Sequence, residues 1–229
     1  MLSLEYCRRM KSIILVHGAW HGSWCWELVE SRMSGNGFNV SSVDLPFTGL
    51  HDDAAFLSNV LDDADGEVIL VGHSYGGMVI SNAAEGKNNI SHLVYLCAIL
   101  LEDGMNMGVP SDPSQESKIK IEVDENLLSI VKPDAVIPAF YKDVDLQIAR
   151  DAINLLRPFP IDSVNVGVGE AWREHPTTYV LCRNDDAINP QTQREMSALA
   201  DTVVEWDCGH SPFFSDPDLV CDLLSQLAK

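Results

Sequence analysis

The chain has 229 residues, of which 46% are hydrophobic, and a formal net charge of −19 from 34 acidic and 15 basic side chains. A chain of this length can bury roughly 70–75% of its unfolded surface, which suits one α/β domain, alone or with an insertion. The negative charge repels phosphate backbones and anionic lipid, so neither nucleic acid nor a membrane is expected as a partner. We expect a protein that acts on a small molecule, with a homodimer left open.

The cysteine pattern and the start of the chain favour the cytoplasm. No C-x-x-C pair occurs among the six cysteines, which are Cys7, Cys25, Cys97, Cys182, Cys208 and Cys221. The apolar run near the start is too short for a signal peptide. We therefore expect free thiols in a reducing compartment, and a flexible leader at residues 1–10.

Strands alternate with helices along most of the chain. The segments that read as strands, most of them continuous apolar runs, are residues 12–18, 38–45, 66–72, 90–100, 177–182 and 201–208. The helical patterns between and after them cover residues 24–37, 51–63, 75–86, 189–200 and 217–228. This alternation is typical of a parallel sheet with helices on both faces. The sequence predicts an α/β fold with six strands, mostly parallel.

Residues 102–174 interrupt this alternation. They contain no long apolar run, and only two weak helical patterns, around 134–142 and 144–156. A segment this long is not a simple connection between two strands. We predict an inserted cap here, and a core made of residues 11–101 and 175–229.

The strongest functional motif is Gly72-His73-Ser74-Tyr75-Gly76, which fits the G-x-S-x-G nucleophile elbow. It lies between an apolar strand and a helix, at the carboxyl end where open parallel sheets bind ligands. The turn is so tight that side chains two residues either side of the serine would collide, hence glycine at both places. We predict that Ser74 is a nucleophile.

A serine nucleophile needs a base, and in this architecture a histidine supplies it downstream. The histidines after Ser74 are His92, His175 and His210. His92 begins a strand and His175 precedes one, whereas His210 follows a strand and so lies on the rim that carries Ser74. We predict that His210 is the base.

The base needs an orienting acid. Asp185 is the first acidic residue after the strand at 177–182, so we expect it to turn inward, whereas Asp186 is expected to face solvent. Glu102 and Asp103, which follow the strand at 90–100, form a second site from which such sheets can supply the acid. We favour Asp185 and leave the others open.

The negative charge of a tetrahedral intermediate needs hydrogen-bond donors. We expect one donor to be the backbone N–H of Tyr75, next after the nucleophile, and the other to be that of Ala19 in the loop after the first strand. In the same loop, His17 is expected to hold the loop by hydrogen bonds. His21 and Trp20 are candidates for the pocket wall.

An apolar cluster in the predicted cap, residues 136–141, is too rich in apolar side chains for a solvated loop. We predict that Phe140 and Tyr141 contribute, with Trp20, to substrate binding by roofing the pocket. The alternative is that they only pack the cap onto the sheet.

Four stretches in this order, "VHGAWHGSWCW", "GHSYGGMVI", "CRNDDAI" and "GHSPFFSDP", resemble the α/β-hydrolase superfamily. The resemblance is to the compact esterases related to plant methylesterases, hydroxynitrile lyases and bacterial carboxylesterases. It runs from about Lys11 to Leu227 and is weakest across the cap. It implies no cofactor and no metal, and the following roles: nucleophile Ser74, acid Asp185, base His210, and oxyanion donors Ala19 and Tyr75.

Two departures separate the chain from the hydroxynitrile lyases. These enzymes usually carry a lysine after the histidine and a threonine in the first loop, where this chain has Ser211 and Ala19. We therefore predict a serine carboxylesterase that hydrolyses a small, uncharged ester through an acyl-enzyme. The alternatives are a lyase or hydrolase of carbon–carbon bonds, and a ligand receptor that does not turn over.

Overall fold

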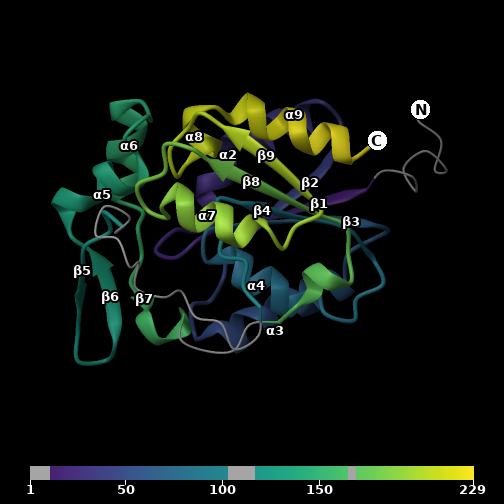
Figure 1. The fold of residues 1–229 in the computed structure, drawn as a ribbon, viewed down its shortest axis with the longest axis horizontal. Helices are drawn as coiled ribbons and strands as arrows, with labels where there is room; N and C mark the ends of the chain where they lie inside the picture. The colour runs from purple at the N-terminus through teal and green to yellow at the C-terminus, as the bar shows by residue number, and fades with distance from the viewer. Residues whose placement is uncertain (1–10, 103–116, 165–168) are drawn as a thin grey trace.

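A six-stranded sheet with the order β2-β1-β3-β4-β8-β9 forms the centre of the molecule (Figure 1). The computed structural model describes residues 11–102, 117–164 and 169–229. All neighbouring strands of this sheet run parallel, so the predicted α/β fold with six strands is confirmed. The strands are β1 (Ser12–Val16), β2 (Asn39–Val43), β3 (Val68–His73), β4 (Ile90–Leu96), β8 (Thr177–Cys182) and β9 (Thr202–Trp206).

Helices cover both faces of this sheet because its central strands are apolar on both sides. Ile13 and Leu15 of β1 belong to one buried cluster with α2 and α9, whereas Ile14 and Val16 belong to another with α3, α4 and α7. The helices of the core are η1 (Ser23–Trp26), α2 (Glu27–Gly35), α3 (Leu50–Asp62), α4 (Gly76–Ala83), α7 (Pro190–Ser197), α8 (Pro212–Ser215) and α9 (Pro217–Leu227).

Residues 117–164, which we call the cap segment, form a separate group of elements at one end of the sheet (Figure 1). Its three strands pair antiparallel in the order β5-β6-β7, an arrangement that the sequence analysis did not predict. The elements are β5 (Ile121–Val123), β6 (Leu128–Val131), α5 (Pro133–Phe140), α6 (Leu146–Ile153), β7 (Phe159–Pro160) and η3 (Ile161–Val164). The turn η4 (Ala171–Arg173) then leads into β8.

Some expectations lie outside the described residues: the leader at 1–10, the thiol of Cys7 and the alternative acid Asp103. The other five cysteines are all described, and each is a free, buried thiol. Within the described ranges, no helix combines the length and the apolar character needed to span a membrane.

Two helical glycines provide a test of the packing around the sheet. At Gly77, in α4, an added Cβ would collide with the carbonyl oxygen of Ile99, whereas at Gly35, at the end of α2, it would meet nothing within 4 Å. We expect Gly77→Ala to lower the free energy of unfolding by ~1–3 kcal/mol through overpacking. Gly35→Ala should raise it by up to ~1 kcal/mol, because alanine restricts the unfolded chain and favours the helix. Urea denaturation measures both, and equal effects would contradict this account.

Candidate active site

The backbone around Ser74 forms a tight elbow between β3 and α4. Ser74 has a φ of 52°, in the left-handed region that few residues other than glycine adopt. An added Cβ at Gly72 would lie 2.6 Å from the Gly76 carbonyl oxygen, and one at Gly76 would lie 2.8 Å from the carbonyl oxygens of Val16 and His17. Only glycine fits at either place, and the crowding fixes the serine at the end of β3.

Asp185 and His210 form a buried pair at the carboxyl ends of β8 and β9. His210 Nδ1 lies 2.7 Å from Asp185 Oδ2, and Asp185 is 3% exposed and His210 2%. Asp185 Oδ1 accepts hydrogen bonds from the backbone N–H groups of Ala187 and Ile188. Oδ2, which faces His210, also accepts a hydrogen bond from Gln193 Nε2. The carboxylate is therefore held in one orientation, with one oxygen directed at the imidazole.

Contacts behind the elbow connect His210 to His73, the residue directly before Ser74. His73 Nε2 donates to the His210 carbonyl oxygen at 2.8 Å, and the two imidazole rings are 4.6 Å apart. The Cys97 thiol points at the same carbonyl at 3.4 Å. In the described part of the chain, the Ser74 hydroxyl makes no hydrogen bond, including to His210. Such bonds often tighten only when substrate is bound.

The two expected oxyanion donors, Ala19 and Tyr75, border the serine. An added Cβ at Gly18 would lie 2.8 Å from Ser74 Cβ, so the loop after β1 packs against Ser74. Neither the Ala19 N–H nor the Tyr75 N–H donates to any group within the described ranges. The Tyr75 hydroxyl is turned away and donates to the buried Asp53 carboxylate at 2.8 Å.

Two buried, neutral histidines fix the loop that carries Ala19. Burial lowers the pKa of His17 to about 4 and that of His21 to about 3, in each case against a backbone hydrogen bond that acts in the opposite direction. A carbonyl can only accept, so His17 Nδ1 donates to the Gly18 oxygen and His21 Nδ1 donates to the Ala19 oxygen, both at 2.9 Å. The expectation that His17 holds this loop by hydrogen bonds agrees with these contacts.

The predicted substrate-binding residues are buried where the cap segment meets the loops after β1 and β9. The ring of Phe140 lies 5.7 Å from that of His210 and 5.9 Å from that of Trp20. The Tyr141 hydroxyl donates to His21 Nε2 at 2.8 Å, since that nitrogen carries no proton in the neutral ring. Trp20 Nε1 donates to the cap residue Ser129. Trp20 and Tyr141 therefore already have partners for their polar atoms.

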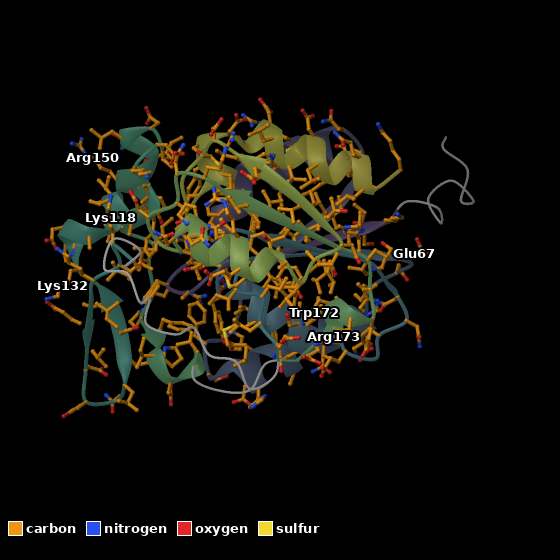
Figure 2. The ribbon with its side chains drawn as sticks, viewed as in Figure 1. Glu67, Lys118, Lys132, Arg150, Trp172 and Arg173 are labelled. Atoms are coloured by element: carbon orange, nitrogen blue, oxygen red, sulfur yellow. The ribbon has the colours of Figure 1, made fainter. Side chains whose placement is uncertain are left out.

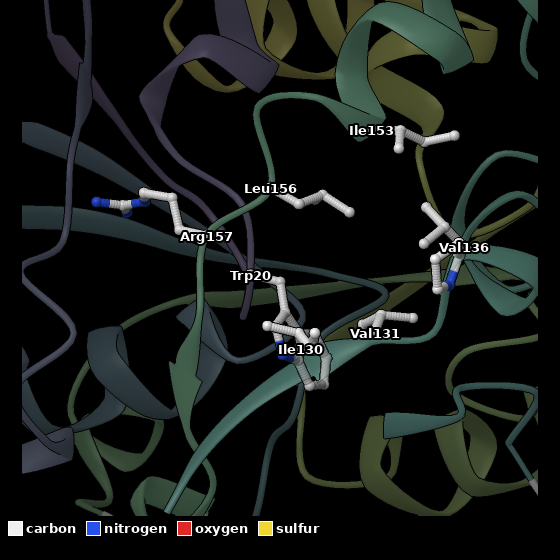
Figure 3. A pocket seen from close by; sticks show the side chains of 8 residues that line it. Trp20, Ile130, Val131, Val136, Ile153, Leu156 and Arg157 are labelled. Carbon is white, nitrogen blue, oxygen red and sulfur yellow. The ribbon is translucent and has the colours of Figure 1, made fainter. Parts of the chain in front are cut away.

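An apolar pocket of about 200 Å³ opens on the cap side of Trp20 (Figure 3). Arg157 stands at its edge, and the figure shows its side chain extending away from the others. Ser74 is not among the residues that line this pocket. The apolar walls come from Trp20, Ile130, Val131, Val136, Ile153 and Leu156.

Asp186 does not turn toward His210, as expected, but it is only partly exposed to solvent. Its side chain is 21% exposed and forms ion pairs with the cap residues Lys118 and Lys142 at 2.7 and 2.8 Å. The reason is that the cap segment lies over the loop after β8, which the sequence pattern could not place. Asp186 therefore connects the cap to the core and does not contact His210.

Three further candidates for the acid and the base have partners elsewhere in the structure. Glu102 forms an ion pair with Arg173 at 2.7 Å. His92 Nε2 is 2.8 Å from the hydroxyl of Thr178, and His175 Nε2 is 3.1 Å from a backbone carbonyl, so both have structural partners. Of the described candidates for the acid, the structure brings Asp185 to His210.

Sequence reasoning missed two residues that support the pair. Gln193 is fully buried in α7 and donates to Asp185, and Asp143 of the cap segment accepts from the Gly209 N–H, directly before His210. A weak signal existed for Gln193, because Gln193 and Met196 are three residues apart and share the buried face of the helix. Nothing in the sequence around Asp143 distinguishes it from the acidic residues on the surface.

Among the described residues, the group that could gather around a metal ion is His73, Cys97 and His210, whose ligand atoms lie within 4.8 Å of one another. His210 is paired with Asp185, and His73 donates to the His210 carbonyl through one of its two nitrogens. The cluster therefore belongs to the site already described and forms no separate metal centre.

Known proteins resemble this chain over nearly its whole length. The chain is 27% identical to the alpha/beta hydrolase nvfD of Aspergillus novofumigatus, over 95% of this chain and 96% of that protein. It is 29% identical to methylesterase 18 of Arabidopsis thaliana, over 94% and 96%. The crystal structure of a pyrethroid hydrolase from Sphingobium faniae JZ-2 superposes with a TM-score of 0.83 at 23% identity, covering 95% of this chain and 97% of that one.

The model of the alpha/beta hydrolase family matches residues 13–223, which span β1, the elbow, the Asp185–His210 pair and most of α9. The chain belongs to the alpha/beta hydrolase family.

Proposed function

We propose that the protein is a serine carboxylesterase that hydrolyses small, uncharged esters. The observation that carries the proposal is the buried hydrogen bond between Asp185 and His210, together with the left-handed backbone conformation of Ser74 in the elbow. The names of relatives of similar length support ester hydrolysis: they include two methylesterases of Arabidopsis thaliana and a polyneuridine aldehyde esterase. The negative charge of the chain disfavours polyanionic substrates.

The reaction proceeds in two steps through an acyl-enzyme. Ser74 Oγ attacks the ester carbonyl while His210 Nε2 takes the hydroxyl proton, and the oxyanion accepts hydrogen bonds from the Ala19 and Tyr75 amides. The tetrahedral intermediate then breaks its bond to the alkoxy oxygen, and His210 returns the proton to the departing alcohol. In the second step, water attacks the acyl-serine with His210 again as base, which releases the carboxylic acid and restores Ser74.

The arrangement disfavours the lyase alternative. Ser211 occupies the place of the lyase lysine, and it is fully buried and uncharged. A departing cyanide would therefore lack the cation that usually stabilises it. Cleavage of mandelonitrile, measured beside ester hydrolysis, separates these two activities, and turnover of an ester separates both from a receptor.

The first test concerns the nucleophile and the acid. Ser74→Ala should lower kcat for p-nitrophenyl acetate by ~10⁴- to 10⁶-fold without unfolding the protein. Asp185→Asn should lower it by ~10⁴-fold, because an amide holds the wrong tautomer of His210.

Asp186→Asn is the matched control for the acid, since it makes the same change one residue away. It should alter kcat far less than Asp185→Asn does, because Asp186 does not contact His210 and its partly exposed ion pairs contribute at most about 1 kcal/mol to stability. Near-normal turnover of Ser74→Ala, or inactivation by Glu102→Gln in place of Asp185→Asn, would refute these assignments.

The second test concerns substrate selection by Phe140, whose ring lies against that of His210. If it contacts the acyl or alcohol group, Phe140→Ala should change the ratio of kcat/KM between short and long p-nitrophenyl esters by ~10-fold. Tyr141→Phe keeps the ring and removes only the hydroxyl bonded to His21, so it should leave that ratio unchanged. Equal losses on all esters with a lower Tm would instead mean that Phe140 only packs the cap segment.

A further inference from the structure

Arg157 connects the cap segment to the loops that follow β1 and β2. It lies between α6 and β7, and its guanidinium stacks over the Phe47 ring at 4.5 Å from the ring centroid. Nη1 pairs with Asp44 at 3.3 Å, and the same carboxylate accepts from the backbone N–H of Ser23. The side chain is thus directed out of the apolar pocket and toward the core (Figure 3).

Arg157 donates hydrogen bonds to the backbone carbonyl groups of Trp20 and His21, the two residues after Ala19. Its backbone N–H donates to the Trp20 oxygen at 2.7 Å. Its Nε and Nη2 both donate to the His21 oxygen, at 3.1 and 3.0 Å. One residue of the cap segment therefore holds the loop on the carboxyl side of the candidate oxyanion donor.

A second set of contacts reaches the amino side of Ala19. Nη2 also donates to the Leu45 oxygen at 3.2 Å, and the Leu45 N–H donates to His17 Nε2 at 2.9 Å. His17 in turn donates to the Gly18 oxygen. The Gly18 carbonyl and the Ala19 N–H belong to one planar peptide group, so whatever orients the carbonyl also orients the N–H.

The backbone at Trp20 explains why this loop needs to be held. Trp20 has a φ of 61°, which is left-handed and unfavourable for a large side chain. Such a conformation costs ~1–3 kcal/mol and persists only where the surroundings enforce it. The backbone N–H of Arg157 on the Trp20 carbonyl and its guanidinium on the His21 carbonyl contribute to this enforcement, beside the bonds from Trp20 Nε1 to Ser129.

We propose that Arg157 is the positioning residue of the oxyanion hole: through Trp20, His21 and Leu45 it holds the Ala19 N–H where a developing oxyanion can accept from it. This role rests on the proposed esterase function. Arg157 touches none of the reacting atoms, so it should affect the rate and not the binding of substrate. Lysine cannot fully replace it, because one ammonium lacks the planar fork that reaches several acceptors at once.

Arg173 provides a matched control. Its guanidinium also lies over an aromatic ring, that of Trp172 at 4.1 Å, and pairs with Glu102. Figure 2 shows Trp172 and Arg173 well away from the cap residues Lys118, Lys132 and Arg150. Removing Arg173 therefore removes a comparable set of contacts that does not reach the loop after β1.

The experiment compares wild type, Arg157→Ala, Arg157→Lys, Arg173→Ala and Ser74→Ala in p-nitrophenyl acetate hydrolysis, with Tm measured for each. Arg157→Ala should lower kcat by ~10- to 100-fold, the effect of misplacing a catalytic group by about 1 Å, with KM nearly unchanged. Arg157→Lys should recover part of this loss. Millimolar guanidinium should raise kcat of Arg157→Ala but not of Arg173→Ala or Ser74→Ala.

Two outcomes would overturn the role of Arg157 alone: wild-type kcat in Arg157→Ala, or a loss of kcat that follows the loss of folded protein and that guanidinium does not restore. If Arg157→Ala does not fold, Arg157→Lys decides the matter, since a folded variant with full kcat refutes the proposal. A wild-type protein without esterase activity, or one whose activity survives in Ser74→Ala, contradicts the proposed function instead.

Discussion

The close approach of three backbone segments around Ser74 is the constraint on which the rest of the site depends. Gly72 and Gly76 lie so near to other carbonyl groups that neither position accepts a Cβ, and the serine between them is left-handed. Because Gly76 packs against the end of β1, the loop after β1 must pass beside the serine. The position of Ala19 next to the nucleophile thus follows from the pairing of β1 with β3.

Three buried histidines around the site remain neutral. Burial holds the pKa values of His17, His21 and His73 far below neutrality, so these rings act as fixed donors and acceptors. Unlike these three, His210 has a carboxylate partner within hydrogen-bond distance, Asp185. In the proposed reaction, Asp185 orients the imidazole that accepts the serine proton.

The sequence predicted the parts of the molecule that local patterns determine. The strand at 177–182 was predicted with the residues that β8 has, because its apolar run is continuous and abruptly bounded. The three-stranded sheet of the cap segment was missed because its strands have two to four residues, and because β7 pairs with β6 from far along the chain. Gln193 and Arg157 were missed for a related reason. Their hydrogen-bond partners are set by tertiary packing, which cannot be read from a single polar residue in the sequence.

The bonds between the cap segment and the core have a consequence for protein engineering. Tyr141 binds His21, Asp143 binds the N–H of Gly209, and Lys118 and Lys142 bind Asp186, so cap residues reach the loops after β1, β8 and β9. Exchanging this insertion for that of a relative, in order to transfer substrate preference, would also exchange the supports of the catalytic loops. A chimaera should therefore lose turnover unless the donor insertion, or compensating changes in the recipient, reproduces these attachments.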